Sequence, residues 1–191
     1  MRLKNSIALL AIVIIGCGLA GCGQVDPYIG QDSVIESSDR RSPKWVKNPP
    51  KPDRKTIYFV GVETSPDKTD SYAYQRALAQ ISQFINTRAT ALYTQESDNS
   101  VAQYRNEYIQ TLSRASVRGA LRQDSYWEYV VVKQSETAED RFYRYYVLVG
   151  ISKKDLLESE KATLEDQLAL SDNDPVIQKA LDRVRTALDE L

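Results

Sequence analysis

Two runs of apolar and aromatic residues decide the fold of this chain. They read Trp127-Glu128-Tyr129-Val130-Val131-Val132 and Phe142-Tyr143-Arg144-Tyr145-Tyr146-Val147-Leu148-Val149. Both runs are rich in the β-branched and aromatic residues that strands favour, and a polar connector at 134–141 separates them. They therefore predict an antiparallel hairpin. Alternation along the first strand places Trp127, Tyr129 and Val131 on one face and Tyr126, Val130 and Val132 on the other.

Upstream of this hairpin the sequence predicts one more strand and one long helix. The run 57–62 is short, β-branched and aromatic, and turn residues at 64–70 follow it. A helix capped by Asp70 or Ser71 is then expected to run to about Thr94, with small residues that let it approach a sheet closely. Its apolar stripe is Ala73, Ala77, Ile81, Phe84, Ile85 and Leu92. In the segment 101–115 the apolar residues fit one face of a helix, and several of them also fit one face of a strand. We expect a helix or irregular structure that leads into a strand.

Two further helices are predicted after the hairpin. Ser152 and Asp155 have the spacing of a capping box, and Asp174-Pro175 is typical of a helix start. The last helix keeps its apolar stripe to Leu191, which leaves two packing partners open, its own sheet or a second copy of the chain. The element order predicts an α+β fold: a small three-stranded antiparallel sheet with a long helix packed on one face (β-α-β-β), plus C-terminal helices.

The start of the chain has the pattern of an export signal. Arg2 and Lys4 precede an apolar run at 7–15, and Leu19-Ala20-Gly21-Cys22 follows. Nine strongly apolar residues are too few to span a bilayer, which needs roughly 20. The four residues ending at Cys22 resemble the lipobox of a bacterial lipoprotein. That resemblance implies cleavage before Cys22 and acylation of its thiol and new amine; a weaker lipobox pattern ends at Cys17.

This interpretation divides the chain into four parts. Residues 1–21 are the signal peptide, and 22–42 are the lipidated N-terminus with a flexible tether, because that segment has few apolar residues and no periodicity. A coil of about 20 residues spans on the order of 25 Å. Residues 43–155 are the α+β domain, whose four prolines between 43 and 52 predict an extended, polyproline-like start. Residues 156–191 are the C-terminal amphipathic helices.

Composition excludes several classes of function. Cleavage removes two of the 25 Lys and Arg residues and none of the 26 Asp and Glu, so the mature net charge is −3, and the chain has no histidine. That charge does not favour nucleic-acid binding. With Cys22 acylated, no free thiol remains for a disulfide, a Cys/His metal site or a cysteine nucleophile. We therefore expect no cofactor, no metal, no nucleic-acid partner and no enzymatic activity.

The folded part also resembles a known family. The segments 43–50 and 57–62, the Ala-rich helix start 73–79 and the strand 145–149 together resemble the twenty-kilodalton outer-membrane lipoprotein family over about residues 43–155. The resemblance implies a dodecin-like domain and a periplasm-facing role, with relatives in flagellar basal-disc assembly and among surface lipoproteins. Gly23 after the acylated cysteine, instead of the aspartate that retains lipoproteins on the inner membrane, implies the outer membrane.

Several side-chain groups have competing interpretations. The aromatic residues of the hairpin fit a sheet core, a subunit interface or a stacking site for a glycan or flat ligand. The arginine series could bind lipid head groups or form a solvated mixed-charge face. The carboxylates of the first C-terminal helix fit an exposed helix face better than an acid–base pair. The groups are Tyr126, Trp127, Tyr129, Phe142, Tyr143, Tyr145 and Tyr146; Arg105, Arg114, Arg118 and Arg122; and Glu158, Glu160, Glu165 and Asp166.

The sequence thus predicts a non-catalytic, membrane-anchored envelope lipoprotein that acts as a structural or assembly component. Its expected partners are membrane lipid, through the acyl chains on Cys22, and either further copies of itself or another envelope protein. The alternative is a periplasmic binding module that regulates a wall enzyme or binds peptidoglycan or another glycan.

Overall fold

The computed structural model describes residues 28–93, 99–172 and 174–191. The predicted lipidation site Cys22 and the predicted signal peptide lie outside the described residues. The elements are β1 (Asp32–Ser37), α1 (Lys44–Lys47), β2 (Thr56–Ser65), α2 (Ser71–Leu92), α3 (Asn99–Arg118), β3 (Leu121–Lys133), β4 (Glu139–Ser152), α4 (Lys153–Leu170) and α5 (Pro175–Asp189).

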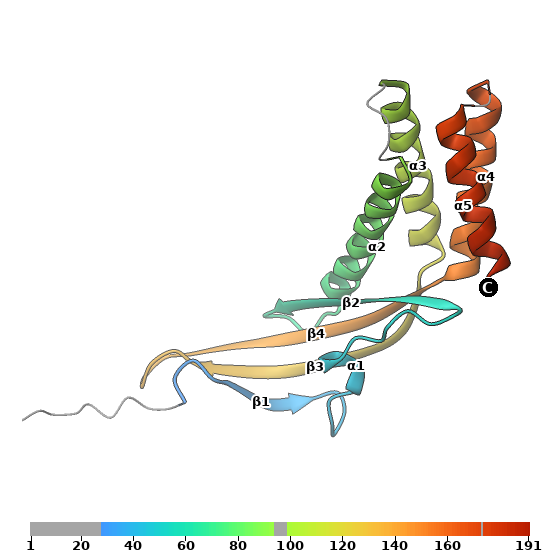
Figure 1. Ribbon diagram of the computed structural model, residues 1–191. Helices are drawn as coiled ribbons and strands as arrows, with labels where there is room; N and C mark the ends of the chain where they lie inside the picture. Colours follow the sequence, from blue (N-terminus) through green and yellow to red (C-terminus); the bar gives the residue numbers. More distant parts are fainter. Residues whose placement is uncertain (1–27, 94–98, 173) are drawn as a thin grey trace, which may run out of the picture.

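The fold is α+β, built on an antiparallel sheet of four strands in the order β1-β3-β4-β2 (Figure 1). The predicted hairpin is confirmed as β3 and β4, which pair from Leu121 with Gly150 to Lys133 with Glu139. The two outer strands pair with different ends of this hairpin. β2 pairs with residues 143–152 of β4, whereas β1 pairs with residues 128–132 of β3, toward the turn.

The fourth strand corrects both the predicted three-stranded sheet and the predicted tether. Asp32–Ser37 lie within the segment 22–42, which the sequence indicates to be flexible, yet they form β1. Residues 32–36 are all exposed, so β1 has none of the buried alternation that marks a strand. Its backbone pairing with β3 supplies the order that its side chains do not indicate.

The long helix packs on the sheet as predicted, and one glycine permits the contact. α2 lies against β2 and β4, with Ala73 and Ala77 fully buried. A Cβ atom on Gly61 of β2 would lie 1.8 Å from the Ala73 carbonyl oxygen and 2.6 Å from the Ala77 amide nitrogen. Only a residue without a side chain lets the two backbones approach this closely.

The remaining helices extend the layer away from the sheet. The ambiguous segment 101–115 belongs to α3, which packs on α2 and α4 through the buried Tyr108 and Leu112. α5 packs on α4, which buries Ile177, Leu181 and Val184 without the sheet or a second copy, whereas Leu191 at the end of the predicted stripe is exposed. The side chains of Ser152 and Asp174 cap α4 and α5 as predicted.

The chain between β1 and β2 lies on the face of the sheet opposite these helices and covers part of it (Figure 1). The predicted polyproline-like start is corrected here, because 44–47 form the short helix α1. Pro43 stands at its N-cap, where proline's fixed φ and missing N–H are tolerated. The indole Nε1 of Trp45 donates a hydrogen bond to Asp124 Oδ2 at 2.7 Å, which fixes α1 to β3.

Candidate functional site

The two edges of the sheet differ in how far they are open to another strand. On β2, Gln80 Nε2 donates to the carbonyl oxygen of Val60 at 2.9 Å, and Asp53 exchanges hydrogen bonds with the backbone N–H and C=O of Thr56. The N–H of Thr64 donates to Glu63 Oε1 at 3.2 Å. Three positions of this edge therefore already have hydrogen-bond partners, which is one way proteins block an edge strand.

The carboxylate of Asp53 is held firmly in this arrangement. Hydrogen bonds from the backbone of Lys55 and Thr56, and then from the Tyr58 hydroxyl, lower the pKa of Asp53. The carboxylate therefore stays ionised, and these hydrogen bonds persist, at any pH near neutrality. The start of β2 is consequently closed by a rigid turn.

The outer edge of β1 is open within the described part of the chain. No side chain there bonds the backbone of residues 33–36, and the exposed fractions of Val34 and Ile35 are 50% and 65%. A β-bulge interrupts the pairing with β3 between Val34 and Glu36. Arg144 Nη2 binds Asp32 Oδ2 at 2.5 Å and anchors the start of the strand. β1 thus offers β-branched side chains and unpaired peptide groups on a held strand.

The aromatic residues of the hairpin are packed against one another. Of the seven, Tyr126 and Tyr145 are buried and the other five are half-buried, so none is fully exposed. Tyr143 is central on the helix-side face: its ring centroid lies 4.8 Å from that of Tyr129 and 5.8 Å from that of Trp127. The core interpretation accounts for the buried pair, and the half-buried cluster leaves the interface interpretation open.

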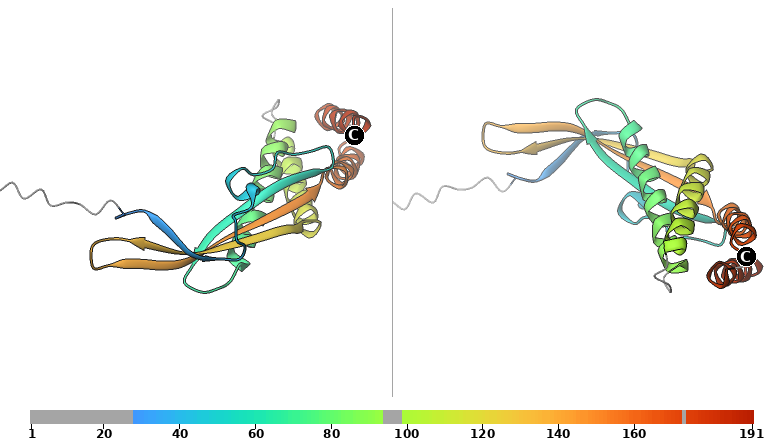
Figure 2. Two further views of the ribbon diagram at one scale, coloured as in Figure 1. Left: turned by 90° about the horizontal axis from the view of Figure 1, so that it is seen from below. Right: turned by 90° about the horizontal axis from the view of Figure 1, so that it is seen from above.

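A lysine covers the tryptophan of this cluster. Nζ of Lys68, in the loop between β2 and α2, lies 3.9 Å from the ring centroid of Trp127. This is a cation–π contact, and it occupies one face of the Trp127 ring, which is then closed to stacking by a flat ligand. Figure 2 shows the tip of the hairpin reaching beyond the helices, so this cluster lies at the border between covered and uncovered sheet.

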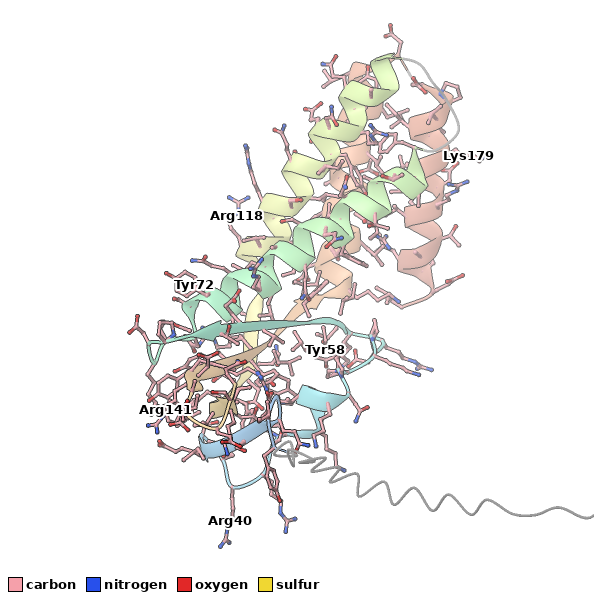
Figure 3. The ribbon with its side chains drawn as sticks, turned by 90° about the vertical axis from the view of Figure 1, so that its left-hand side faces the viewer. Arg40, Tyr58, Tyr72, Arg118, Arg141 and Lys179 are labelled. Carbon is pink, nitrogen blue, oxygen red and sulfur yellow. The ribbon has the colours of Figure 1, made fainter. Side chains whose placement is uncertain are left out.

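The arginine series does not form one patch. Arg105, Arg114 and Arg118 belong to α3, but Arg122 belongs to β3 and binds Asp70 Oδ2 at 2.6 Å. Figure 3 shows Arg118 directed away from the body of the molecule. The series, for which lipid binding and a solvated mixed-charge face are the two interpretations, is therefore divided between α3, where Arg114 and Arg118 are exposed and Arg105 is half-buried, and a paired residue of β3.

The predicted exposed carboxylate face of α4 is wrong for one residue. Glu160 is fully buried, and Arg88 of α2 binds both of its carboxylate oxygens at 2.7 Å. This hydrogen-bonded pair raises the pKa of Arg88, and burial raises the pKa of Tyr108 nearby. The bidentate geometry joins α2 to α4. The other three carboxylates of that group are not buried; Glu158 and Glu165 make surface ion pairs.

A second set of buried hydrogen bonds, centred on Gln167, also joins helices of this layer to one another. The Tyr93 hydroxyl donates to Gln167 Oε1 at 2.6 Å, and Gln167 Nε2 donates to the carbonyl oxygen of Tyr104 at 2.8 Å. Tyr93 and Gln167 are buried. Every partner here is satisfied by another protein group, so the contact fixes the relative position of α2, α3 and α4.

The described residues contain no group of three or more His, Cys, Asp or Glu placed to hold a metal ion. In the same part of the chain, no helix is both long and apolar enough to cross a membrane. No protein-family model and no curated protein matches the chain. The resemblance to the twenty-kilodalton lipoprotein family therefore stays a prediction, and the surfaces described above carry the functional argument.

Proposed function

We propose that this protein is a non-catalytic lipoprotein of the bacterial envelope, held in the outer membrane by acyl chains on Cys22, where it acts as a structural or assembly component. The observation that carries the proposal is the difference between the two sheet edges: residues 33–36 of β1 have no side-chain partner for their backbone within the described chain, whereas three positions of the β2 edge have one. The sequence supplies the anchor, and the sheet supplies the surface on which an assembly can form.

The anchor and the open edge are close along the chain. Only ten residue steps separate Cys22 from Asp32, the first residue of β1. Fully extended, they reach about 35 Å. A tether of twenty residues that ended at residue 42 would reach about 70 Å when fully extended, so the start of the sheet at β1 lowers the greatest height of the sheet above the membrane by about half.

We assign the β1 edge to a second copy of the chain. A protein with two open edges can add copies at both and form a filament, whereas one open edge permits only a closed, symmetric pair. The blocked β2 edge fits the closed pair. Strand addition at β1 would cover Val34 and Ile35 and pair the outward backbone groups of both copies.

Light scattering of the acylated protein in detergent, with the detergent mass subtracted, tests this assignment. We expect a dimer that the substitution Ile35→Lys converts to a monomer, because lysine on an edge strand opposes pairing. Leu170→Lys is the matched control, since Leu170 is a comparably exposed apolar residue on α4. A wild-type monomer at every concentration, or equal effects of the two substitutions, would refute the assignment.

Metabolic labelling with a fatty acid tests the anchor. Cys22→Ser should abolish the label and release the protein from the membrane fraction, whereas Cys17→Ser should leave both unchanged. Label that survives Cys22→Ser and is lost in Cys17→Ser would move the lipidation site to Cys17. If the wild-type protein takes up no fatty-acid label, the lipoprotein proposal is refuted.

One observation favours the alternative, a periplasmic module that binds peptidoglycan or another glycan. Trp127, Tyr129 and Tyr143 form a half-buried aromatic cluster at the border of the helical layer. A pull-down on purified peptidoglycan separates the two functions. Retention that Tyr129→Ala abolishes would support the binding module, provided that Tyr72→Ala, which removes an exposed tyrosine from α2, leaves retention unchanged.

A further inference from the structure

The segment 40–51, which we call the basic segment, is the most positively charged stretch of the described chain. It contains five cations, Arg40, Arg41, Lys44, Lys47 and Lys51, and no carboxylate. The mature chain has a net charge of −3, so everything outside the basic segment carries −8. Positive charge is thus concentrated in twelve residues of a chain that is otherwise acidic.

The basic segment lies on the face of the sheet opposite α2–α5 (Figure 1). It forms the turn after β1, the helix α1 and the beginning of the connection to β2. All five cations are exposed, and none makes an ion pair with another described residue. Figure 3 shows Arg40 projecting away from the molecule on this side, far from the helices.

This segment is held in place by its apolar residues. Trp45 and Val46 are half-buried, and the hydrogen bond from the Trp45 indole to Asp124 fixes α1 against β3. Glu36 and Asp39 precede the segment in sequence and Asp53 follows it; Asp53 already accepts hydrogen bonds from Lys55, Thr56 and Tyr58. The helix α1 is therefore held against β3, and the five cations, which make no ion pair within the described chain, keep their charge available for an external anion.

We propose that the basic segment binds the anionic phospholipid head groups of the leaflet that holds the acyl chains. The proposal rests on the lipoprotein function proposed above, because the chain from Cys22 enters β1 and leaves it directly into this segment. Clusters of Lys and Arg beside an anchor are attracted to an anionic surface, and each cation near it strengthens binding about fivefold. The contact would orient the sheet with its helices directed away from the lipid.

Vesicle flotation of the processed chain, residues 22–191 with Cys22→Ser, measures this contact without the acyl chains. The vesicles contain phosphatidylcholine with 30% phosphatidylglycerol, or phosphatidylcholine alone, in 0.1 M salt. We expect binding to the anionic vesicles only, and a loss on raising the salt to 0.5 M, because screening shortens the range of the attraction.

A pair of charge-matched variants tests the location. The triple substitution Arg40→Gln, Arg41→Gln and Lys44→Gln should weaken binding to anionic vesicles about a hundredfold. The control, Arg114→Gln, Arg118→Gln and Arg183→Gln, removes the same charge from exposed helix positions and should change binding less than threefold. If the first triple loses its circular-dichroism signal, Arg40→Gln with Arg41→Gln replaces it, with an expected loss of about 25-fold.

The outcomes separate this inference from the proposed function. Equal losses in both triples would show a response to net charge alone and would overturn the inference, as would absence of binding to anionic vesicles. Either result leaves the lipoprotein function standing if the fatty-acid label is on Cys22. Conversely, a chain that is never acylated but binds anionic vesicles through the basic segment would refute the anchor and retain the contact.

Discussion

The ion pair between Arg88 and Glu160 allows a quantitative test of how the helical layer is held together. The two side chains differ in exposure: that of Glu160 is fully buried, whereas that of Arg88 retains 33% of its accessible surface. Removing one partner leaves the charge of the other unpaired. An unpaired carboxylate that is fully buried destabilises the fold more than an unpaired guanidinium that is still in contact with water. The two single substitutions should therefore have unequal effects.

The magnitude follows from the two hydrogen bonds. Each joins charged groups at 2.7 Å, and such bonds contribute about 1.5–3 kcal/mol each. We expect Arg88→Met to lower the free energy of unfolding by about 4 kcal/mol, in the range for breaking a buried pair. Glu160→Met should lower it by about 2 kcal/mol, because partial hydration of Arg88 offsets part of the loss. The double variant, which buries two apolar side chains, should lie within about 1 kcal/mol of the wild type.

Urea unfolding followed by circular dichroism measures these values. With a slope of about 2 kcal/mol per molar urea, Arg88→Met displaces the midpoint by about 2 M. The cycle then gives a coupling free energy of about 6 kcal/mol. Equal losses in the two single variants would refute the argument from exposure. A double variant as unstable as Arg88→Met would show that the pair itself contributes more than its apolar replacement.

Three further perturbations test other parts of the structure. Gly61→Ala should cost about 3 kcal/mol or more, because the new Cβ meets the backbone of α2; Gly119→Ala, whose Cβ would lie 3.5 Å from its nearest neighbour, should be close to neutral in the same urea assay. Asp174→Ala should lower the unfolding free energy by about 1 kcal/mol in thermal melts, because its side chain caps the N–H of Val176 at 2.8 Å; Asp189→Ala, at the other end of α5, is the control, and equal losses would remove the capping argument. Burial raises the pKa of Tyr93 and Tyr108, so the folded state keeps both protons where the unfolded chain releases them; the contribution of these two tyrosines to stability should therefore be constant below about pH 10 and fall above it, and an absorbance titration in which all twelve tyrosines ionise before unfolding would contradict this.

The sequence predicted the elements whose side chains carry a burial pattern. The stripe of α2, the alternation of β3 and the capping residues Ser152 and Asp174 each depend on neighbours within a few positions. The same local information indicated that Ala73 and Ala77 would allow close packing. It did not identify Gly61 as the partner position, because that contact joins two separate elements.

The features that sequence analysis missed depend on distant partners. β1 is exposed along almost all of its length, so the pairing of Val34 with Val130, nearly a hundred residues away, leaves no periodic signal. Val34-Ile35 within a polar stretch was the one available indication of a strand. Glu160 lies in a charged stretch that is typical of a solvated face, and only the bidentate contact with Arg88 explains its burial. The basic segment was visible in the sequence as five cations without a carboxylate, but its position opposite the helices required the structure.

The proposed anchor, the open edge and the basic segment meet at one strand, and this placement couples them. The chain from Cys22 enters β1, the basic segment leaves it, and its outer edge is free to pair. Acylation would confine every copy to a thin layer at the membrane, and contact of the basic segment would fix the height of β1 above it. Both restrictions raise the effective concentration of one edge near another. Dimerisation through β1 should therefore occur at a lower protein density on anionic vesicles than on neutral ones, and the Arg40, Arg41 and Lys44 triple variant should remove that difference while retaining Ile35 at the edge. Energy transfer between labelled acylated copies at known surface density measures it, and equal dimerisation on both lipids would show that the edge and the basic segment act independently.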